Sequence, residues 1–142
     1  MAGIYSYITF NGNCLEAMTY YQKCFGGRLV VQTIGGSPLG KNLPRHLKKY
    51  VLSASLTKKD MILMGSDIVP ENGLIKGNSV SLSLFCDSEK EIERLYKKLA
   101  VDGQANQPLQ ITFWNAIFGN VTDKFGVHWL LNFDKHKKQH KT

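Results

Sequence analysis

Histidine is the side chain best suited to general acid–base chemistry near neutral pH, and this chain has four histidines. His46 falls in a stretch rich in glycine, proline and basic residues, while His136 and His140 fall near the end of the chain. Only His128 lies in a strand-like run, which would hold it at a defined point on a sheet. We predict His128 as the candidate catalytic residue. A hydrogen-bonded, non-catalytic histidine is the alternative.

Two strand-like runs alternate small hydroxyl side chains with apolar ones. A period of two puts Ser6, Ile8 and Phe10 on one face of the first run. The same period puts Ser81 and Ser83 on one face of the second, with leucines opposite. Uncharged hydroxyls suit the floor of a ligand cavity, because they leave room and offer hydrogen bonds. A face that is simply exposed to solvent is the alternative.

Aromatic and basic residues extend the set of candidate ligand contacts. Phe113 and Trp114 stand just before another strand-like run, where they would form either an aromatic wall for a planar ligand or part of the core. The stretch 35–49 carries Lys41, Arg45 and Lys48. These cations would either close over an anionic ligand or keep an extended surface loop soluble.

The three cysteines, Cys14, Cys24 and Cys86, cannot all pair, and none belongs to a CxxC motif. This pattern favours reduced thiols in a cytoplasmic protein. Cys14 falls at the start of a predicted helix, where the helix dipole would lower its pKa and make it reactive. A small buried apolar residue is the alternative.

Length and composition indicate one soluble domain spanning residues 1–142, with 43% apolar and 20% charged residues. Without the four lysines of the tail 135–142, the net charge falls from +7 to +3. A short basic terminus is more typical of a solvated end than of a nucleic-acid arm. No apolar run approaches the ~18 residues of a membrane span, and no secretory signal is visible. We therefore expect no membrane or nucleic-acid partner and a cytoplasmic location.

The chain repeats a strand and a helix, and the two copies are 75 positions apart: Asn13 corresponds to Ser88 and Tyr21 to Tyr96. The expected strands are 6–10 and 79–85, and the expected helices are 14–25 and 89–100. Asn13 precedes Glu16 by three residues, as Ser88 precedes Glu91, and this spacing predicts a capping box at the start of each helix.

Three further strand-like runs follow each predicted helix. In the first half they are 28–34, 50–57 and 61–65, and in the second half they are 108–112, 116–122 and 127–133. The halves would span 3–67 and 78–134, joined by a linker at 68–77 that is rich in proline and glycine. We predict an α+β fold in which two βαβββ repeats form a curved mixed sheet around a cavity.

Two segments resemble a known superfamily. Residues 10–21, closing with Phe25-Gly26-Gly27, are similar to the opening of glyoxalase/bleomycin resistance/dioxygenase domains, the vicinal oxygen chelate superfamily. Residues 118–129, preceded by Thr112-Phe113-Trp114, resemble the 3-demethylubiquinone methyltransferase-like (PhnB-like) branch. The resemblance implies a small organic ligand and a homodimer.

The resemblance also implies a divalent metal held by His, Glu or Gln side chains. The corresponding positions here fall on Ser6, Ser81 and Leu130, with a fourth near Leu63 or Met64. None of these is a usual ligand for a divalent cation. We therefore expect no metal site and no other cofactor.

The sequence favours metal-free binding of a small organic molecule in a cavity between the repeats, and it leaves open whether a reaction follows. The expected ligand contacts are Ser6, Ile8, Phe10, Ser81, Ser83, Met64, Phe113, Trp114 and Leu130. One alternative is a metal-dependent lyase, isomerase or dioxygenase. Another is a methyltransferase, as the branch name suggests, although no glycine-rich loop joins a strand to a helix as in nucleotide-type cofactor sites.

Overall fold

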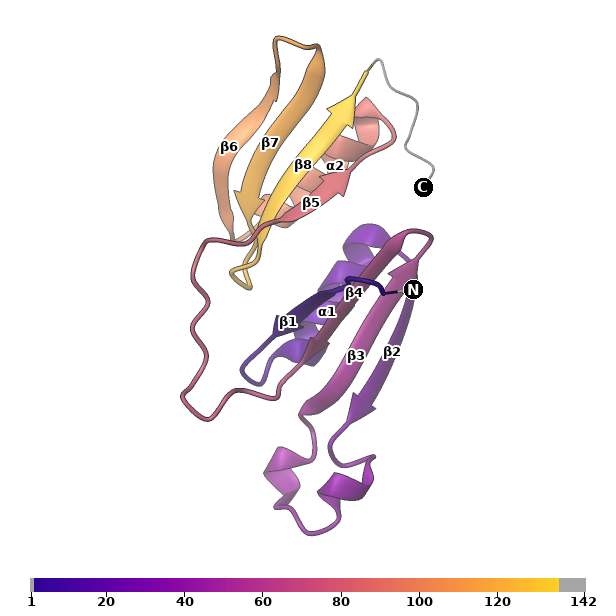
Figure 1. Cartoon of the computed structure of the whole chain (residues 1–142), viewed down its shortest axis with the longest axis vertical. Coiled ribbons are helices and arrows are strands. Elements are labelled where there is room, and N and C mark those ends of the chain that lie inside the picture. The colour runs from indigo at the N-terminus through magenta and orange to yellow at the C-terminus, as the bar shows by residue number, and fades with distance from the viewer. Residues whose placement is uncertain (1, 136–142) are drawn as a thin grey trace. The chain divides into compact units, whose positions relative to one another are not determined.

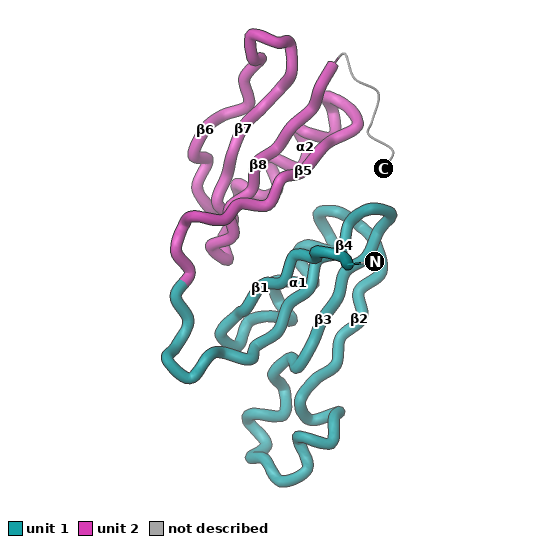
Figure 2. The backbone as a smooth tube through the Cα atoms, in the orientation of Figure 1, with its two compact units in different colours: residues 1–75 teal, residues 76–142 magenta. Residues whose placement is uncertain are grey.

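The computed structural model describes residues 2–135, which form two compact units divided between Ile75 and Lys76 (Figure 2). Each unit has one strand, one helix and three further strands, so the predicted βαβββ repeat and α+β class are confirmed. Among the described residues, no helix is both long and apolar enough to cross a membrane. The predicted basic tail lies almost entirely outside the described residues.

The first unit is a four-stranded sheet covered on one face by a helix (Figure 1). Its elements are β1 (Ser6–Thr9), α1 (Cys14–Phe25), β2 (Arg28–Thr33), β3 (Val51–Lys58) and β4 (Met61–Ser66). The strand order is β1-β4-β3-β2, with β1 parallel to β4 and the other pairs antiparallel. α1 begins and ends at the predicted residues.

The second unit repeats this arrangement. Its elements are β5 (Leu82–Phe85), α2 (Glu89–Ala100), β6 (Gln104–Ile111), β7 (Ala116–Thr122) and β8 (His128–Asp134). The order is β5-β8-β7-β6, again with one parallel pair, β5 with β8. β6 begins four residues before the predicted start at Pro108, because its polar first half pairs with β7 without showing apolar alternation.

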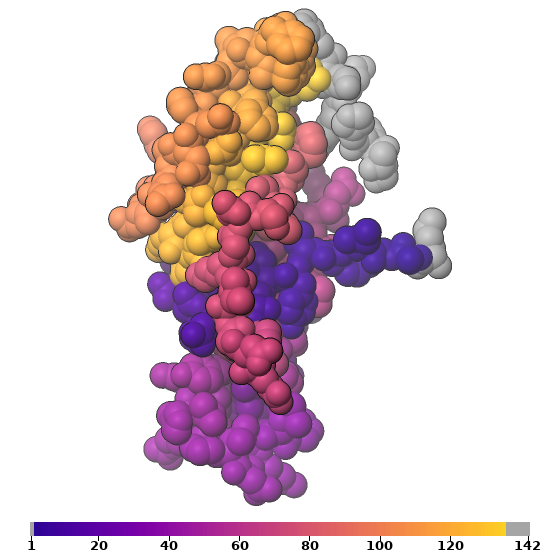
Figure 3. Space-filling model, turned by 60° about the vertical axis from the view of Figure 1, so that its left-hand side comes forward, coloured from indigo at the N-terminus to yellow at the C-terminus, as the bar shows by residue number. Residues whose placement is uncertain are grey.

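The insertion at 35–49 in the first unit folds into two short 3-10 helices, η1 (Pro38–Gly40) and η2 (Arg45–Leu47). Its two ends are held together, since the Ile34 amide donates to the Tyr50 carbonyl at 2.8 Å. The Gly35 amide donates to the Lys48 carbonyl at 2.9 Å. The insertion extends beyond the ends of β2 and β3, where Figure 3 shows these residues in purple.

Each unit has its own core between the helix and the sheet. The fully buried side chains of α1 include Met18 and Tyr21, and α1 packs mainly on β3, whose Leu56 is fully buried. In the second unit, Ile92 and Leu99 of α2 are also fully buried. The predicted apolar stripes of both helices are therefore confirmed. Within residues 2–135, each unit has its one helix on one face of its own sheet (Figure 1).

The start of α1 is capped by a residue distant in sequence. Asp67 follows β4, and its Oδ1 accepts hydrogen bonds from the amides of Cys14 at 3.0 Å and Gly12 at 2.9 Å. Its Oδ2 accepts from the Val51 amide at 2.8 Å, at the start of β3. The predicted Asn13 cap is wrong, because the Asn13 side chain makes no capping hydrogen bond. A carboxylate beside free amides is the stronger partner.

α2 is capped as predicted at Ser88, whose hydroxyl accepts from the Glu91 amide at 3.1 Å. The Glu91 carboxylate accepts a hydrogen bond from the Asp87 amide at 2.8 Å. In a standard capping box the donor would be the amide of Ser88, one residue later. The two helices therefore begin with different devices. Only the second device is encoded locally.

We predict that Asp67→Ala lowers the free energy of unfolding by about 3 kcal/mol, because three amides lose a charged acceptor at once. Urea denaturation followed by circular dichroism measures it. Asp60→Ala, which removes an equal charge from the exposed β3–β4 turn, is the matched control. Asn13→Ala should change the unfolding free energy by less than about 0.5 kcal/mol. A larger loss for Asn13→Ala than for Asp67→Ala contradicts this account.

Candidate functional site

The face of the second sheet that α2 leaves uncovered carries mostly polar, uncharged side chains, with the carboxylate of Asp134 at the far end of β8. Val121, Trp129 and Leu131 are buried toward α2, so the side chains that alternate with them point to the other face. The strand register aligns these open-face residues in rows across β5, β8, β7 and β6. The middle row is Ser83, Leu130, Asn120 and Gln107.

Two more rows flank it. On one side lie His128, Thr122 and Gln104, and on the other lie Phe85, Asn132, Phe118 and Gln110. No Lys, Arg, Asp or Glu occupies any of these positions, although such residues make up 20% of the chain. A face in bulk solvent normally carries charged side chains. The composition of this face therefore favours a partner that excludes water.

A β-bulge in β6 places two consecutive amide side chains on this one face. The register between β6 and β7 shifts between Gln104 and Gln107. As a result Asn106 reaches Thr122, and Gln107 reaches Asn120, although neighbours on a regular strand point to opposite faces. Bulges of this kind commonly re-aim side chains at the edges of sheets and beside active sites.

The bulge is held from the helix side of the sheet. The Tyr96 hydroxyl of α2 donates to the carbonyls of Gln107 at 2.7 Å and Asn120 at 3.2 Å. Burial raises the pKa of Tyr96, so the phenol keeps this proton. Gly119 allows β6 to approach closely, because a Cβ at Gly119 would lie 2.9 Å from Leu109 Cδ2 and 3.1 Å from the Gln107 carbonyl oxygen.

A chain of hydrogen bonds crosses the sheet at the His128 row. The Thr122 hydroxyl donates to Asn106 Oδ1 at 2.8 Å and lies 2.9 Å from His128 Nδ1. His128 Nε2 lies 3.3 Å from the Gly77 carbonyl oxygen. Thr122 gives its one proton to Asn106, so a hydrogen bond between Thr122 and His128 needs a proton on Nδ1. The Gly77 carbonyl can only accept, so a hydrogen bond there needs a proton on Nε2.

These groups surround a hollow of about 400 Å³, which is within the size range of small-molecule sites. It is lined by Asn78, Ser81, Gln104, Asn106, Asn120, Val121, Thr122, His128, Trp129 and Leu130. A second hollow of about 170 Å³ lies beside Phe118, between β6 and β7. Its lining includes Pro108 and Ile111, so it is less polar than the first.

Four of the predicted contacts lie on this face: Ser81, Ser83, Leu130 and the candidate acid–base residue His128. The sequence analysis missed the amides Asn106, Gln107 and Asn120. Pro108 could have revealed them, because it lies inside a run of uncharged polar residues and proline in a strand marks an edge strand or a bulge.

The predicted face of Ser6 and Ile8 is wrong. Ser6 pairs with buried Leu63, and Ile8 pairs with Gly65, whose missing Cβ would lie 3.3 Å from Cys14 Sγ of α1. Both side chains therefore point to the helix-covered face. Four residues separate β1 from α1, but only three separate β5 from α2. Equivalent residues of the two strands are therefore 76 positions apart in the sequence, whereas equivalent residues of the two helices are 75 apart. A shift of one residue exchanges the two faces.

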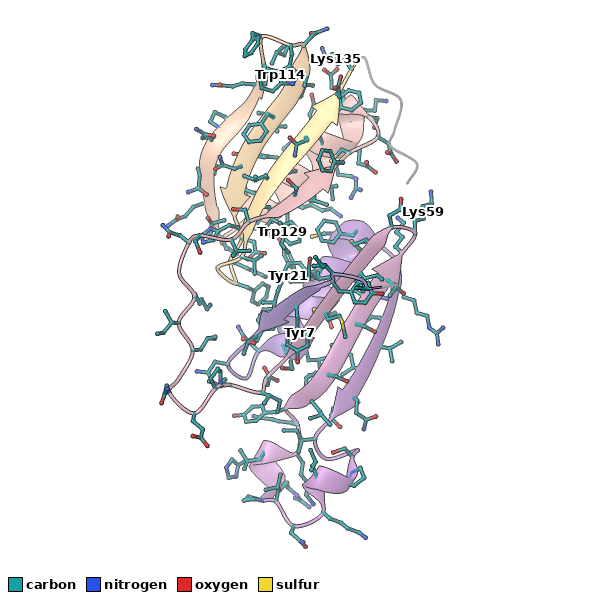
Figure 4. The ribbon with its side chains drawn as sticks, viewed as in Figure 1. Tyr7, Tyr21, Lys59, Trp114, Trp129 and Lys135 are labelled. Carbon is teal, nitrogen blue, oxygen red and sulfur yellow. The ribbon has the colours of Figure 1, made fainter. Side chains whose placement is uncertain are left out.

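Phe10 also differs from its prediction, because it is 2% exposed and packs against Gly65 in the core beneath α1. Met64 pairs with Tyr7 and Ser55 on the face of the first sheet that α1 leaves open. That face carries exposed Tyr7, which Figure 4 labels, together with half-exposed Val30. It is less polar than the open face of the second sheet.

Phe113 and Trp114 occupy the turn between β6 and β7. Figure 4 labels Trp114 at the tip of this hairpin. They are 97% and 55% exposed, so neither belongs to the core. Their rings meet edge to face with centroids 4.7 Å apart, and Asn115 turns the chain with a φ of 63°. They do not line either hollow.

Comparison with known proteins shows the family to which the chain belongs. Residues 2–132 match the family model described as 3-demethylubiquinone-9 3-methyltransferase. The chain belongs to this family. Protein YjdN of Escherichia coli strain K12 is 32% identical over 139 residues, which cover 91% of this chain and 93% of YjdN.

Solved structures agree with this assignment. The crystal structure of protein PA1353 from Pseudomonas aeruginosa is 38% identical, with a TM-score of 0.83 and coverage of 94% of this chain and 98% of PA1353. A glyoxalase/bleomycin resistance protein/dioxygenase family enzyme from Burkholderia phytofirmans is 14% identical, with a TM-score of 0.59 and coverage of 90% and 96%. The second comparison shows a shared fold.

The motif at 118–129 that resembles the family is largely architectural. Asp123 is 3% exposed and accepts from the Trp129 indole at 2.8 Å, from the Phe125 amide at 2.8 Å and from the Val127 amide at 3.1 Å. Its carboxylate thereby fixes the β7–β8 hairpin, in which Gly126 has a φ of 86°. This hairpin sets the position of His128 on the open face.

The divalent metal that the superfamily implies does not fit the residues at the corresponding positions. Ser81 and Leu130 lie on the open face of the second sheet, where they offer one hydroxyl and no charged ligand. Within residues 2–135, no three His, Cys, Asp or Glu side chains gather closely enough to hold an ion. Of the residues that line the hollow, His128 is the one His, Cys, Asp or Glu.

All three cysteine thiols are buried, and burial keeps those of Cys14 and Cys86 protonated. Burial, with a smaller effect of Asp67, raises the pKa of Cys14 to about 12. Burial also raises the pKa of Cys86 to about 12, with Glu91 and Asp87 adding to the shift and Arg94 opposing it. The predicted lowering at Cys14 is wrong, because desolvation and the capping carboxylate outweigh the helix dipole. The alternative, a small buried apolar residue, is confirmed.

We predict that Ellman's reagent reacts slowly with the native protein at pH 8. A pKa of about 12 leaves about one thiolate in ten thousand at that pH, and Cys24 is also buried. Denaturation in urea should release all three thiols for rapid reaction. A stoichiometric fast phase in the native protein would show that a thiol is exposed and activated.

Proposed function

We propose that the protein binds a small organic molecule on the open face of the second sheet, in the hollow next to His128. The observation that carries this proposal is the uncharged, hydrogen-bonded hollow of about 400 Å³ formed by β6, β7 and β8. A surface that lacks charge but offers many hydrogen-bonding groups suits a ligand better than it suits bulk water. The predicted cavity between the two repeats stays a prediction.

His128 is the residue of this site best placed for acid–base chemistry. Its ring is oriented by Thr122 at Nδ1 and by the Gly77 carbonyl at Nε2, and imidazole can give or take a proton near neutral pH. If the ligand is transformed, proton transfer at Nε2 is the step that this chain's own residues support. Binding alone needs only the hydrogen bonds.

The three cysteines are buried and form no disulfide, which supports a reducing location, and we propose the cytoplasm. We also propose that the chain forms a homodimer. The exposed aromatic pair Phe113 and Trp114 supports this, because large aromatic side chains at a surface are typical of protein contacts.

We predict that a small molecule co-purifies with the protein and that Leu130→Arg abolishes its retention. An arginine at 130 would fill the hollow and bring an unpaired cation into an uncharged site. Mass spectrometry of the extract released by denaturation measures the retained molecule. Leu15→Arg, the same substitution at an exposed position on α1, is the matched control and should retain it. Equal retention by both variants would place the site elsewhere.

The metal-dependent and methyltransferase alternatives are tested on protein purified without chelator or metal-affinity resin. We expect elemental analysis to give well below one divalent ion per chain, because the residues that line the hollow include no carboxylate or thiol ligand. We also expect no thermal stabilisation by S-adenosylmethionine. Near-stoichiometric zinc, nickel, manganese or iron would support a metal enzyme. A marked rise in melting temperature with S-adenosylmethionine would support the activity in the family's name.

A further inference from the structure

We infer that the ligand of this face is an uncharged molecule with an amide-like head and a flat apolar body, held with its head at Asn120 and its body over Phe118. This inference rests on the proposed function and names the class of molecule that the same hollow would take. It depends on three features: the absence of charge, the hydrogen-bonding groups left unused, and the order of polar and apolar rows.

The charges close to the site are used by the fold. Asp123 is satisfied by two amides and the Trp129 indole, and the Lys76 ammonium donates to the Phe125 carbonyl at 2.9 Å. Neither occupies the three rows of the open face, and Asp134 lies in the row beyond Phe118, on the side away from Asn120. A ligand carrying a full charge would therefore lose its hydration without meeting an opposite charge, which is a large cost. A neutral ligand avoids it.

In each of the side-chain amides of Asn106, Gln107 and Asn120, one of the two polar groups, NH₂ or oxygen, makes no hydrogen bond within the described chain. Asn106 uses its oxygen to accept from Thr122, so its NH₂ group remains. Asn120 donates to Gln107 Oε1 at 2.6 Å, which leaves the Asn120 oxygen and the Gln107 NH₂ group. Within the described chain, these remaining groups have no hydrogen-bond partner. Two donors beside one acceptor complement a group that itself both donates and accepts, as a carboxamide does.

The polarity of the face changes along β7. Asn120 and Phe118 are two residues apart on the same face, which separates them by about 7 Å. Phe118 lines the smaller hollow with Ile111 and Pro108, and it pairs with Asn132, whose neighbour on β5 is Phe85. A ring attached directly to a carboxamide spans this distance. The aromatic face of Phe118 then offers it an offset stacking surface.

The test uses three probes of the same shape but different charge: benzamide, benzoate and benzamidine. Titrations of the full-length protein, followed by NMR of side-chain amide and aromatic signals, measure both site and affinity. We expect benzamide to shift the signals of Asn106, Asn120 and Phe118. Benzoate and benzamidine should bind at least about tenfold more weakly, because each brings an unpaired charge.

The Asn120→Asp variant reverses the selectivity. The new carboxylate should weaken benzamide binding at least about tenfold and favour benzamidine, which then finds a counter-charge. Asn115→Asp makes the same charge change in the hairpin turn, at a position with positive φ that aspartate tolerates. It should leave the benzamide affinity within about twofold, and its spectrum confirms that the added charge does not disturb the fold.

The possible failures are distinct. Tighter binding of benzoate or benzamidine to this face of the native protein overturns the inferred ligand class and leaves the proposed function standing. Another outcome would contradict the inferred ligand class but not the proposed function. In it, benzamide does not shift the NMR signals of this face, while a molecule still co-purifies with the native protein and is lost in Leu130→Arg. The proposed function itself falls if Leu130→Arg and Leu15→Arg retain the same material.

Discussion

The hydrogen-bonded register of β5, β8, β7 and β6 holds each side chain of the open face in its row. The register is set from the other face, where Leu82, Trp129 and Val121 align beneath α2. Slipping one strand by a single residue would expose these apolar side chains and bury serine, asparagine or histidine in their place. The packing of the core thus decides the chemistry of the surface on the opposite side of the sheet.

β6 departs from the regular alternation of side chains, and its bulge brings additional polar side chains to the open face. A regular strand could present only every second residue, but the bulge presents Asn106 and Gln107 together. Tyr96 from below and the missing side chain of Gly119 stabilise the bulge. A feature held from both its neighbouring strand and the helix is preorganised, so a ligand would not have to order it.

Each unit also turns one carboxylate inward to organise its backbone. Asp67 joins the start of α1 to the start of β3, and Asp123 closes the β7–β8 hairpin around the Trp129 indole. In both cases amide or indole donors surround the carboxylate, which satisfies a charge that would be costly to bury alone. These carboxylates serve the fold, and the three rows around His128, Asn120 and Phe118 stay uncharged.

The sequence by itself determined the features that depend on local patterns. Apolar periodicity located both helices, alternation placed Ser83 and Leu84 on opposite faces of β5, and two motifs identified the family. Because these signals lie within a dozen or so neighbouring residues, they can be recognised without the fold.

Only the tertiary structure decided what depends on residues distant in sequence. The cap of α1 comes from Asp67, 53 positions after Cys14, so no local spacing reveals it. Ser6 faces the helix because its pairing with Leu63 outweighs the apparent repeat with Ser81. The amides of β6 share one face because of a bulge whose register exists only against β7. In each case the deciding partner lies on another strand, and the chain must fold before that partner is in place.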